Sequence, residues 1–221
     1  MLKEYGIITV LVGIVQFEFE ETMEKIIDYL LHMIPYMLFA LPFILIVRTV
    51  IVKVKGLGKA TTILHETGLL LFCLYLIGLA SQTIIPALEI RSSGIGILFT
   101  GAIGGVNLIP GKVFYDIWYE GSVHGYWLYF FINFLGNICL FMPIGFGINL
   151  LWRNLTLSKT TLIGLGVSFF IEICQFPQNR HSDIDDLWLN TLGAVLGYSV
   201  YKISDKFMHK LFEKFKIRRN I

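Results

Sequence analysis

Residues 168–197 read SFFIEICQFPQNRHSDIDDLWLNTLGAVLG, in which two apolar runs flank a short polar segment. The pattern predicts two membrane-spanning helices joined by a polar connection. Glu172 lies inside the first apolar run, where an ionisable side chain is costly unless it has a partner. We interpret the rest of the chain as a helical scaffold that brings further polar groups to this segment.

The composition of the whole chain agrees with a membrane protein. Of the 221 residues, 55% are hydrophobic and only 15% are charged, whereas charged residues approach a quarter of an ordinary soluble domain. Several runs approach or reach the length of about 20 apolar residues that crosses the hydrocarbon core of a bilayer. The three cysteines lie in apolar runs, so we interpret them as small buried hydrophobic residues, not as a disulfide set.

The predicted fold is an all-α, polytopic helical membrane bundle with five confident transmembrane spans and a short N-terminal apolar segment. The predicted spans cover residues 29–52, 67–85, 126–152, 160–176 and about 187–203. The N-terminal run, residues 5–19, is short for a span and is left open as a thin span, a re-entrant piece or an interfacial helix. Gly193 and Gly197, four residues apart, allow a neighbouring helix to approach the fifth span closely.

The chain divides into three parts in this prediction. Residues 1–66 hold the N-terminal segment, the first span and a basic connection; residues 67–203 form the main membrane domain; residues 204–221 form a basic tail. The tail reads as a cytoplasmic helix against anionic lipid. Within the main domain, residues 86–125 are rich in glycine and aromatic residues and predict a segment at the membrane surface or dipping into it.

The distribution of lysine and arginine gives the orientation. The connections 48–66 and 153–159 and the tail hold 13 basic residues, whereas the connections 86–125 and 177–186 hold 3. By the positive-inside rule the tail lies in the cytoplasm and the polar segment faces outside. We therefore expect a multi-pass protein of the cell membrane with its polar site on the outer side.

This topology brings polar groups from three spans to a similar depth in the outer half of the membrane, at 1.5 Å per helical residue. Aspartates and asparagine at positions i, i+3 and i+7 share one helical face. The candidate ligand-binding residues are Asn133, Asn137, Glu172, Gln175, Arg180, Asp183, Asp186 and Asn190. Glu172 is also the candidate catalytic residue, and no cofactor, metal site or nucleic-acid partner is expected.

Each of these residues also has a purely structural interpretation. Asp183 would cap a helix, with Asp186 in its first turn. Glu172 would pair with Arg180 only to hold two spans together, and Asn133 and Asn137 would form hydrogen bonds between helices. A separate alternative is a divalent metal site that includes His181, in the pattern H-x-D-x-D. The sequence there lacks the second histidine or the cysteine pair of common metal sites.

Several segments together resemble the VanZ-like family of bacterial membrane proteins. The first holds Asn137, Leu140, Phe141, Pro143, Gly145 and Phe146; the second Ile171, Glu172 and Gln175; the third Arg180, Asp183, Asp185, Asp186, Asn190, Gly193 and Gly197. Asn107, Leu108, Ile109 and Pro110 resemble another family segment ahead of the third span. The resemblance covers about residues 67–203 and implies a role in lowering susceptibility to the glycopeptide teicoplanin, as for the family's namesake.

Three functions stay open at the level of the sequence. In the first, an outer pocket binds a lipid-linked cell-wall precursor, its pyrophosphate or a lipid-anchored drug, with Arg180 on phosphate or carboxylate. In the second, a membrane-embedded hydrolase or transferase acts on an envelope lipid with Glu172 as general acid or base, and the aspartates hold a divalent metal. In the third, the chain is a non-catalytic partner subunit. Membrane lipids are partners in all three, and the oligomeric state is not predicted.

Overall fold

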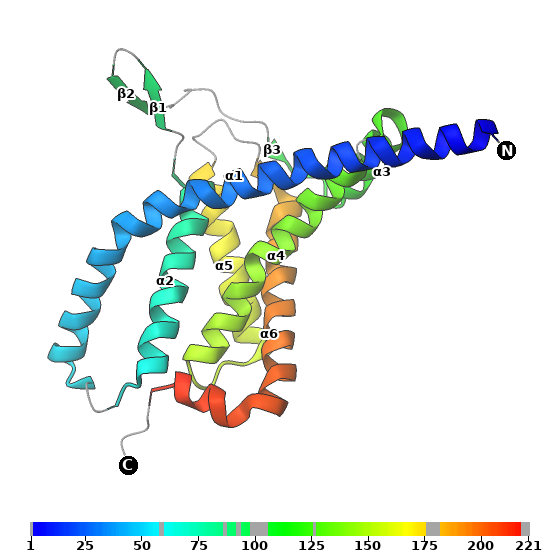
Figure 1. The fold of residues 1–221 in the computed structure, drawn as a ribbon. Helices are drawn as coiled ribbons and strands as arrows, with labels where there is room; N and C mark the ends of the chain where they lie inside the picture. Colours follow the sequence, from blue (N-terminus) through cyan, green and yellow to red (C-terminus); the bar gives the residue numbers. More distant parts are fainter. Residues whose placement is uncertain are drawn as a thin grey trace.

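A computed structural model describes residues 2–57, 60–85, 88–91, 94–97, 106–125, 127–175 and 182–217 (Figure 1). It confirms the predicted helical bundle. The helices are α1 (Leu2–Val54), α2 (Ile63–Thr83), α3 (Lys112–His124), α4 (Trp127–Leu151), α5 (Leu157–Gln175), α6 (Ile184–Phe212) and the 3-10 helix η3 (Glu213–Phe215). The strands are short: β1 (Leu88–Arg91), β2 (Gly94–Ile97), β3 (Val106–Asn107) and β4 (Ser182–Asp183).

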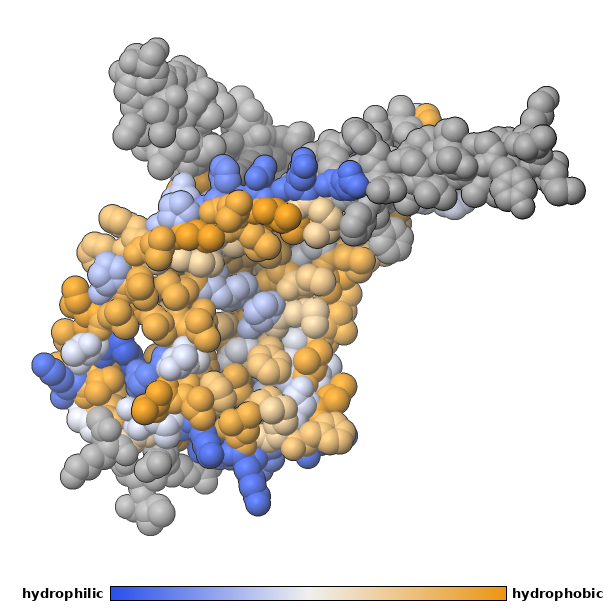
Figure 2. All heavy atoms as spheres, viewed as in Figure 1, coloured by the Kyte–Doolittle hydropathy of each residue, from blue (hydrophilic) through white to orange (hydrophobic). Residues whose placement is uncertain are grey.

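Four helices, α2, α4, α5 and α6, run alternately up and down beside one another (Figure 1). Leu79, Phe141, Ile144 and Ile171 from three of them form the buried apolar core. Along the visible side the surface is largely apolar, with hydrophilic residues gathered towards the two ends (Figure 2). This distribution is the one expected of a bundle whose sides face hydrocarbon.

Within the described residues, four helical segments are long and apolar enough to cross a membrane: Ile26–Val54, Ile63–Thr83, Phe134–Leu151 and Leu157–Gln175. They correspond to the first four predicted spans. The fifth predicted span lies in α6, which packs beside α4 and α5 but carries more polar residues than the other four. It therefore falls short of the same measure of apolarity, and its crossing of the membrane stays a prediction.

Helices α4 and α6 are in backbone contact along a seam of glycines. A Cβ atom at Gly193 or Gly197 would overlap the carbonyl oxygen of Ile138 or Met142 on α4. A Cβ atom at Gly145 would in turn overlap the carbonyl oxygen of Ala194 on α6. The close helix approach predicted from the G-x-x-x-G spacing is therefore present, and it aligns the upper ends of α4 and α6.

Helix α1 is one continuous helix of 53 residues that includes the N-terminal apolar run. Its N-terminal half lies across the upper end of the bundle, and its C-terminal part turns down beside α2 (Figure 1). Pro35 and Pro42 lie inside this helix, and proline inside a helix removes a backbone hydrogen bond and favours a bend. Of the three arrangements left open for residues 5–19, this orientation favours the interfacial helix.

A row of hydrophilic residues follows the N-terminal half of α1, above an apolar band (Figure 2). Glu20, Glu24, Asp28 and His32 are four residues apart and exposed, so they share one face of the helix. Helix α3 is also amphipathic, and it exposes Phe114, Tyr115, Trp118, Tyr119 and Val123. Aromatic residues of this kind are typical of helices at a membrane surface, as predicted for this part of the chain.

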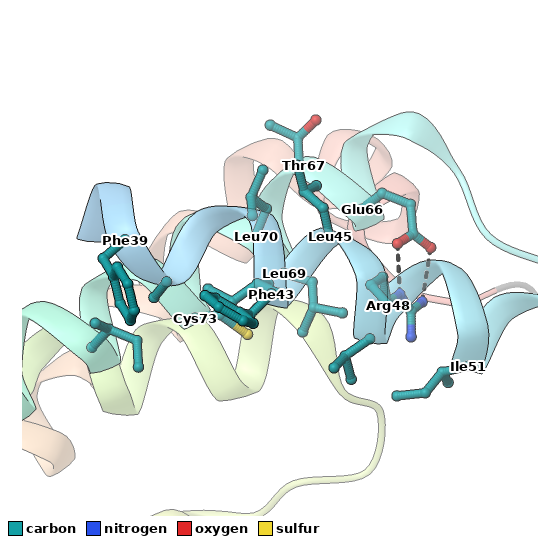
Figure 3. A pocket seen from close by; sticks show the side chains of 14 residues that line it. Phe39, Phe43, Leu45, Arg48, Ile51, Glu66, Thr67, Leu69, Leu70 and Cys73 are labelled. Atoms are coloured by element: carbon teal, nitrogen blue, oxygen red, sulfur yellow. Dashed lines mark hydrogen bonds and ion pairs between the residues drawn. The ribbon is translucent and has the colours of Figure 1, made fainter. Parts of the chain in front are cut away.

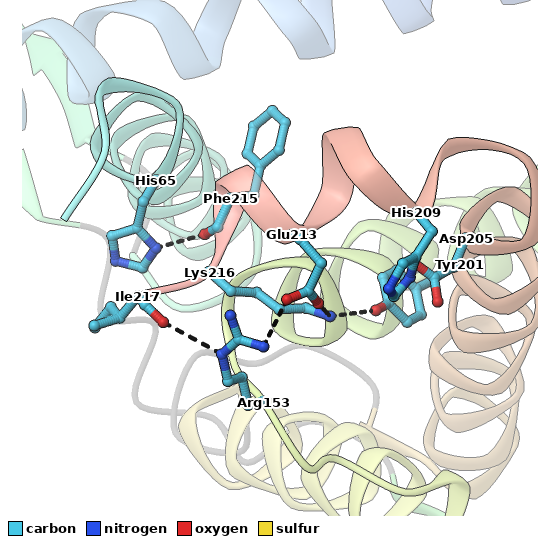
Figure 4. A network of polar contacts seen from close by, with 9 residues as sticks. All are labelled: His65, Arg153, Tyr201, Asp205, His209, Glu213, Phe215, Lys216 and Ile217. Atoms are coloured by element: carbon cyan, nitrogen blue, oxygen red, sulfur yellow. Dashed lines mark hydrogen bonds and ion pairs between the residues drawn. The ribbon is translucent and has the colours of Figure 1, made fainter. Parts of the chain in front are cut away.

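At the lower end the chain folds back under the bundle. Helix α6 continues past residue 203, has a kink at Met208 and ends at Phe212, which is buried against Phe146 and Tyr201. The carbonyl of Phe215 then lies 2.6 Å from Nδ1 of His65 at the start of α2 (Figure 4). The segment predicted as a separate basic tail is thus packed, up to residue 217, against the membrane domain.

Candidate functional site

The described part of the polar segment, Gln175 and the residues from Ser182 onward, lies at the upper end of the bundle, where α5 ends and α6 begins. Strand β4 pairs with β3 in parallel, so that Val106 is opposite Ser182 and Asn107 is opposite Asp183. Two segments more than 70 residues apart in the chain therefore meet here. We call the group formed by Asn107, Asn137, Glu172, Asp183, Asp185 and Asp186 the upper polar cluster.

Asp183 is the N-cap of α6. Its carboxylate accepts a hydrogen bond from the backbone N–H of Asp185 at 2.9 Å and another from Nδ2 of Asn107 at 2.9 Å. Its own backbone N–H donates to Oε2 of Glu172 at 3.3 Å. The capping interpretation thus describes Asp183, and its contacts also join α5, α6 and β3.

Asp185 holds the N-terminus of α3 against α6. Its side chain accepts hydrogen bonds from the backbone N–H groups of Gly111 and Val113 and from Nε1 of Trp188, each at 2.7 Å. The residue is only 1% exposed. Burial acts to raise the pKa of this carboxyl, but the three hydrogen bonds outweigh it and hold the pKa below its ordinary value. An ionised aspartate at a helix N-terminus also interacts favourably with the helix dipole.

Gly111 gives this arrangement its backbone geometry. It precedes α3 with φ of +82°, a left-handed conformation that glycine adopts without steric cost. In this conformation its N–H and that of Val113 both reach the same carboxylate. Sequence reasoning missed this role of Asp185, because its partners are backbone N–H groups 72 and 74 residues earlier in the chain, and no residue pattern marks such a contact.

Asp186 has a different environment from the other two aspartates. Its Oδ1 accepts a hydrogen bond from Nδ2 of Asn137 on α4 at 2.5 Å, and it caps no helix in the described residues. It precedes Leu187, where the predicted fifth span begins. Burial, with the negative charges of Asp183 and Asp185, raises the pKa of Asp186 to about 6, against the hydrogen bond from Asn137.

Of the remaining predicted site residues, the structure describes the side chains of Asn190 and Gln175 only. Asn190 is buried and donates from Nδ2 to Oγ of Ser168 on α5 at 3.0 Å, a hydrogen bond between helices below the cluster. Gln175 is the last residue of α5. Arg180 and His181 lie outside the described residues, as does the side chain of Asn133 on α4. The predicted pair of Glu172 with Arg180 therefore stays a prediction.

An aromatic group borders the upper polar cluster on the side of α3. The ring of Phe114 stacks on Trp188 with a centroid distance of 5.9 Å, and Phe134 lies 5.7 Å from Phe114 and 6.3 Å from Trp188. Trp188 belongs to both groups, because its indole N–H donates to Asp185. The site thus combines carboxylates with an apolar wall, an arrangement suited to an amphipathic ligand.

The chemistry that the cluster offers is mainly that of hydrogen-bond acceptors. Among the described residues, Asp183, Asp185 and Asp186 form no ion pair with lysine or arginine. In the same part of the chain, no group of three or more histidine, cysteine, aspartate or glutamate side chains is placed to hold a metal ion. The acceptor groups suit amines, amides and hydroxyl groups.

Comparison with known proteins gives one match. The model of the VanZ/LLP1 family matches residues 67–205, which is more than half of the chain. The matched part includes most of α2, all of α3 to α5, most of α6 and the whole upper polar cluster, and it leaves out α1. No curated protein and no solved structure matches the chain.

Proposed function

We propose a function from the premise that this chain belongs to the VanZ/LLP1 family. It is a multi-pass membrane protein whose upper polar cluster faces the outside of the cell and binds an envelope ligand. The ligand is a lipid-linked cell-wall precursor or a lipoglycopeptide drug, and binding lowers the susceptibility of the cell to teicoplanin. The antibiotic connection comes from the family, and the binding role comes from the residues.

Asp186 is the observation that carries the proposal. The structural interpretations account for Asp183 as a helix cap, for Asp185 as the anchor of α3 and for Asn190 as a bond between helices. Among the described residues, Asp186 accepts one hydrogen bond, from Asn137, whereas a carboxylate can accept several. A mostly buried carboxylate with unused acceptor capacity supports a role in binding.

Glu172 extends this surface from α5. Its Oε2 lies 3.3 Å from the backbone nitrogen of Asp183. The carboxylates of Glu172 and Asp186 are on α5 and α6, which meet at the same end of the bundle. In the proposed complex, Asp186 and Glu172 contact amine or sugar hydroxyl groups of the ligand. Arg180 contacts its phosphate or carboxylate, since guanidinium suits oxyanions with two oxygens.

Asp186→Asn tests the proposal, because it removes the charge and keeps the size of the side chain. Cells expressing this variant should lose the decrease in teicoplanin susceptibility that the wild type gives, at equal protein levels in the membrane. Asp205→Asn is the matched control, because it removes an aspartate charge from the same helix outside the upper polar cluster, where Asp205 pairs with His209. It should leave susceptibility close to that of wild-type cells.

Two outcomes would contradict the proposal. Wild-type expression that leaves teicoplanin susceptibility unchanged would remove the antibiotic role for this chain. Full protection by Asp186→Asn at normal membrane levels would remove Asp186 from the binding surface.

A second candidate, an enzyme acting on an envelope lipid, is favoured by the pKa of Asp186, since acid–base groups in active sites have pKa values near the working pH. Glu172 is the other candidate acid or base. Incubation of the purified protein with a lipid-linked precursor, followed by mass spectrometry, separates the two candidates. A new product that Asp186→Asn and Glu172→Gln both abolish would establish the enzyme, and an unaltered precursor would exclude turnover of that substrate.

A further inference from the structure

A groove of about 610 Å³ lies between the C-terminal part of α1 and α2 (Figure 3), and none of its lining residues belongs to the upper polar cluster. Its walls are mainly apolar and include Phe39, Phe43, Leu70 and Cys73. At the lower end of the bundle, Nε and Nη2 of Arg48 donate to the two carboxylate oxygens of Glu66 at 2.7 and 2.8 Å. The groove is therefore apolar along its length and charged at one end.

Beyond the opposite end of the groove, next to Ile77, α1 and α2 are in close contact. The side chains of Met33 and Met37 on α1 lie directly over Gly78 of α2, where a Cβ atom would contact both. From Gly78 to Glu66 is 12 residues of helix, or about 18 Å at 1.5 Å per residue. The groove therefore has a limited length, an apolar interior and one polar end.

We propose that the groove binds one acyl chain of an anionic phospholipid, with the lipid phosphate at Arg48. Two nitrogens of Arg48 point to Glu66, and the third points away from it (Figure 3). The third nitrogen, Nη1, makes no hydrogen bond among the described residues, so its N–H groups are available to a phosphate oxygen.

The charge of the surrounding surface agrees with an anionic lipid. Lys53 and Lys55 follow Arg48 at the lower end of α1 and are exposed. Glu66 neutralises one positive charge of this rim and leaves the two lysines. Basic residues beside a membrane-spanning helix attract anionic lipid, by about 1 kcal/mol for each lysine or arginine.

The walls of the groove favour a lipid chain over a helix from a second copy of the protein. Helices that pack in membranes approach through small residues, whereas this groove presents bulky side chains such as Phe39, Phe43, Leu70 and Ile77. Phe39 and Phe43 are also exposed, so the groove is continuous with the lipid-facing surface of α1. An acyl chain from the surrounding leaflet can enter without any rearrangement of the helices.

Cys73 gives a direct measurement, because its side chain lines the groove. The purified full-length chain, with Cys139→Ser and Cys174→Ser to leave one thiol, is held in a non-ionic detergent and alkylated with N-ethylmaleimide. Phosphatidylglycerol should slow the alkylation of Cys73 about tenfold more than phosphatidylcholine does, the effect of one charge-assisted hydrogen bond.

Arg48→Gln combined with Glu66→Gln should abolish the difference between the two lipids, while it keeps an uncharged pair at the same place. Arg153→Gln with Glu213→Gln is the matched control, because that ion pair also joins arginine and glutamate at the lower end at 2.7 Å. Its side chains are 30% and 33% exposed, against 20% and 32% for Arg48 and Glu66, and it does not line the groove. The control should keep the preference for phosphatidylglycerol.

Ala40→Phe tests the acyl chain separately from the phosphate. It fills the groove and should make the alkylation rate of Cys73 insensitive to either lipid. Equal protection by both lipids, unchanged by the Arg48→Gln and Glu66→Gln pair, would overturn the phosphate contact. Protection that rises with protein concentration in the absence of lipid would show that a second copy covers the groove and would overturn the proposal.

Discussion

The carboxylates at the two ends of the bundle have different hydrogen-bond partners. At the lower end, Glu213 accepts hydrogen bonds from Arg153 at 2.7 Å and from Lys216 at 3.0 Å, and Lys216 also donates to Tyr201 (Figure 4). At the upper end, the donors to Asp183, Asp185 and Asp186 are backbone N–H groups, asparagine amides and an indole. The lower carboxylate is neutralised by cations, whereas the upper ones are solvated by dipoles.

This difference suits two different roles: the lower ion pairs hold parts of the chain together, and the upper carboxylates form the candidate site. At the lower end, Arg153 and Lys216 neutralise the carboxylate of Glu213, and these ion pairs bind the last helical turn to the loop after α4. Dipoles at the upper end stabilise the carboxylates without cancelling their charge. Among the described residues, these carboxylates therefore have no ion pair, and the charge of Lys112 acts on Asp183 and Asp185 only at longer range.

The largest predicted effect concerns which end faces outward. In a background without native cysteines, Ser92→Cys and Asn179→Cys should react with an impermeant thiol reagent added to intact cells, and Asn220→Cys should not. The expected result is all or none, because the basic residues lie at the lower end. Reaction at position 220 alone would reverse the orientation and place the upper polar cluster inside the cell.

The next effect concerns Asp185. Asp185→Ala leaves two backbone N–H groups and one indole N–H without their acceptor, and it should lower the stability of the protein in detergent by about 3 kcal/mol. Thermal unfolding and protease cleavage within α3 measure this loss. The control is Asp116→Asn, which removes an exposed pair with Lys112 on the same helix and should change stability by less than about 0.5 kcal/mol. If Asp185→Ala were as stable as the wild type, the hydrogen bonds from these N–H groups to Asp185 would contribute nothing to the stability of the upper end.

The smallest effect concerns Glu213. Burial acts to raise its pKa, but the hydrogen bonds from Lys216 and Arg153 outweigh burial and the pKa lies below its ordinary value. Its stabilisation is therefore present above the ordinary pKa of glutamate and is lost as the pH falls through the lower value of the folded protein. Glu213→Gln should cost about 1 kcal/mol at neutral pH, since the pair is a third exposed, and this cost should disappear as the pH falls below the lowered pKa of Glu213 in the folded protein.

Thermal unfolding of wild type and Glu213→Gln across that pH range measures the difference. A cost that does not change with pH would mean that Glu213 acts by packing and not by charge, and the contrast between the two ends would lose its basis.

The sequence predicted the helical bundle because the spans are long apolar runs whose limits need no tertiary information. It also predicted that Asn137, Glu172 and Asp186 would converge, since rise per residue and alternating direction place them at similar depth. The hydrogen bond of Asn137 with Asp186, and that of Glu172 with the backbone of Asp183, follow from this arrangement. The spacing of Gly193 and Gly197, four residues apart on one helix face, predicted the close approach of a neighbouring helix.

The missed features depend on contacts between distant and irregular segments. Asn107 was noticed only for its resemblance to a family segment, because a two-residue strand has no periodicity to detect. The fold-back after Met208 contains no proline or glycine that would signal a turn. The groove at Arg48 needs the crossing of α1 and α2, which hydropathy does not describe.

The glycine seam between α4 and α6 restricts how this protein moves. Since carbonyl oxygens lie where side chains would be, sliding either helix past the other brings backbone against Cα or side-chain atoms after a short distance. This packing resists relative movement of α4 and α6 and so holds Asn137 and Asp186 at a fixed separation. A displacement linked to ligand falls more readily to α1, which touches the bundle mainly through α2, or to α3, which Asp185 and the ring contacts of Phe114 hold. In the upper polar cluster, the residues on α4 and α6 are therefore held in place, whereas the neighbouring α3 and α1 are less constrained.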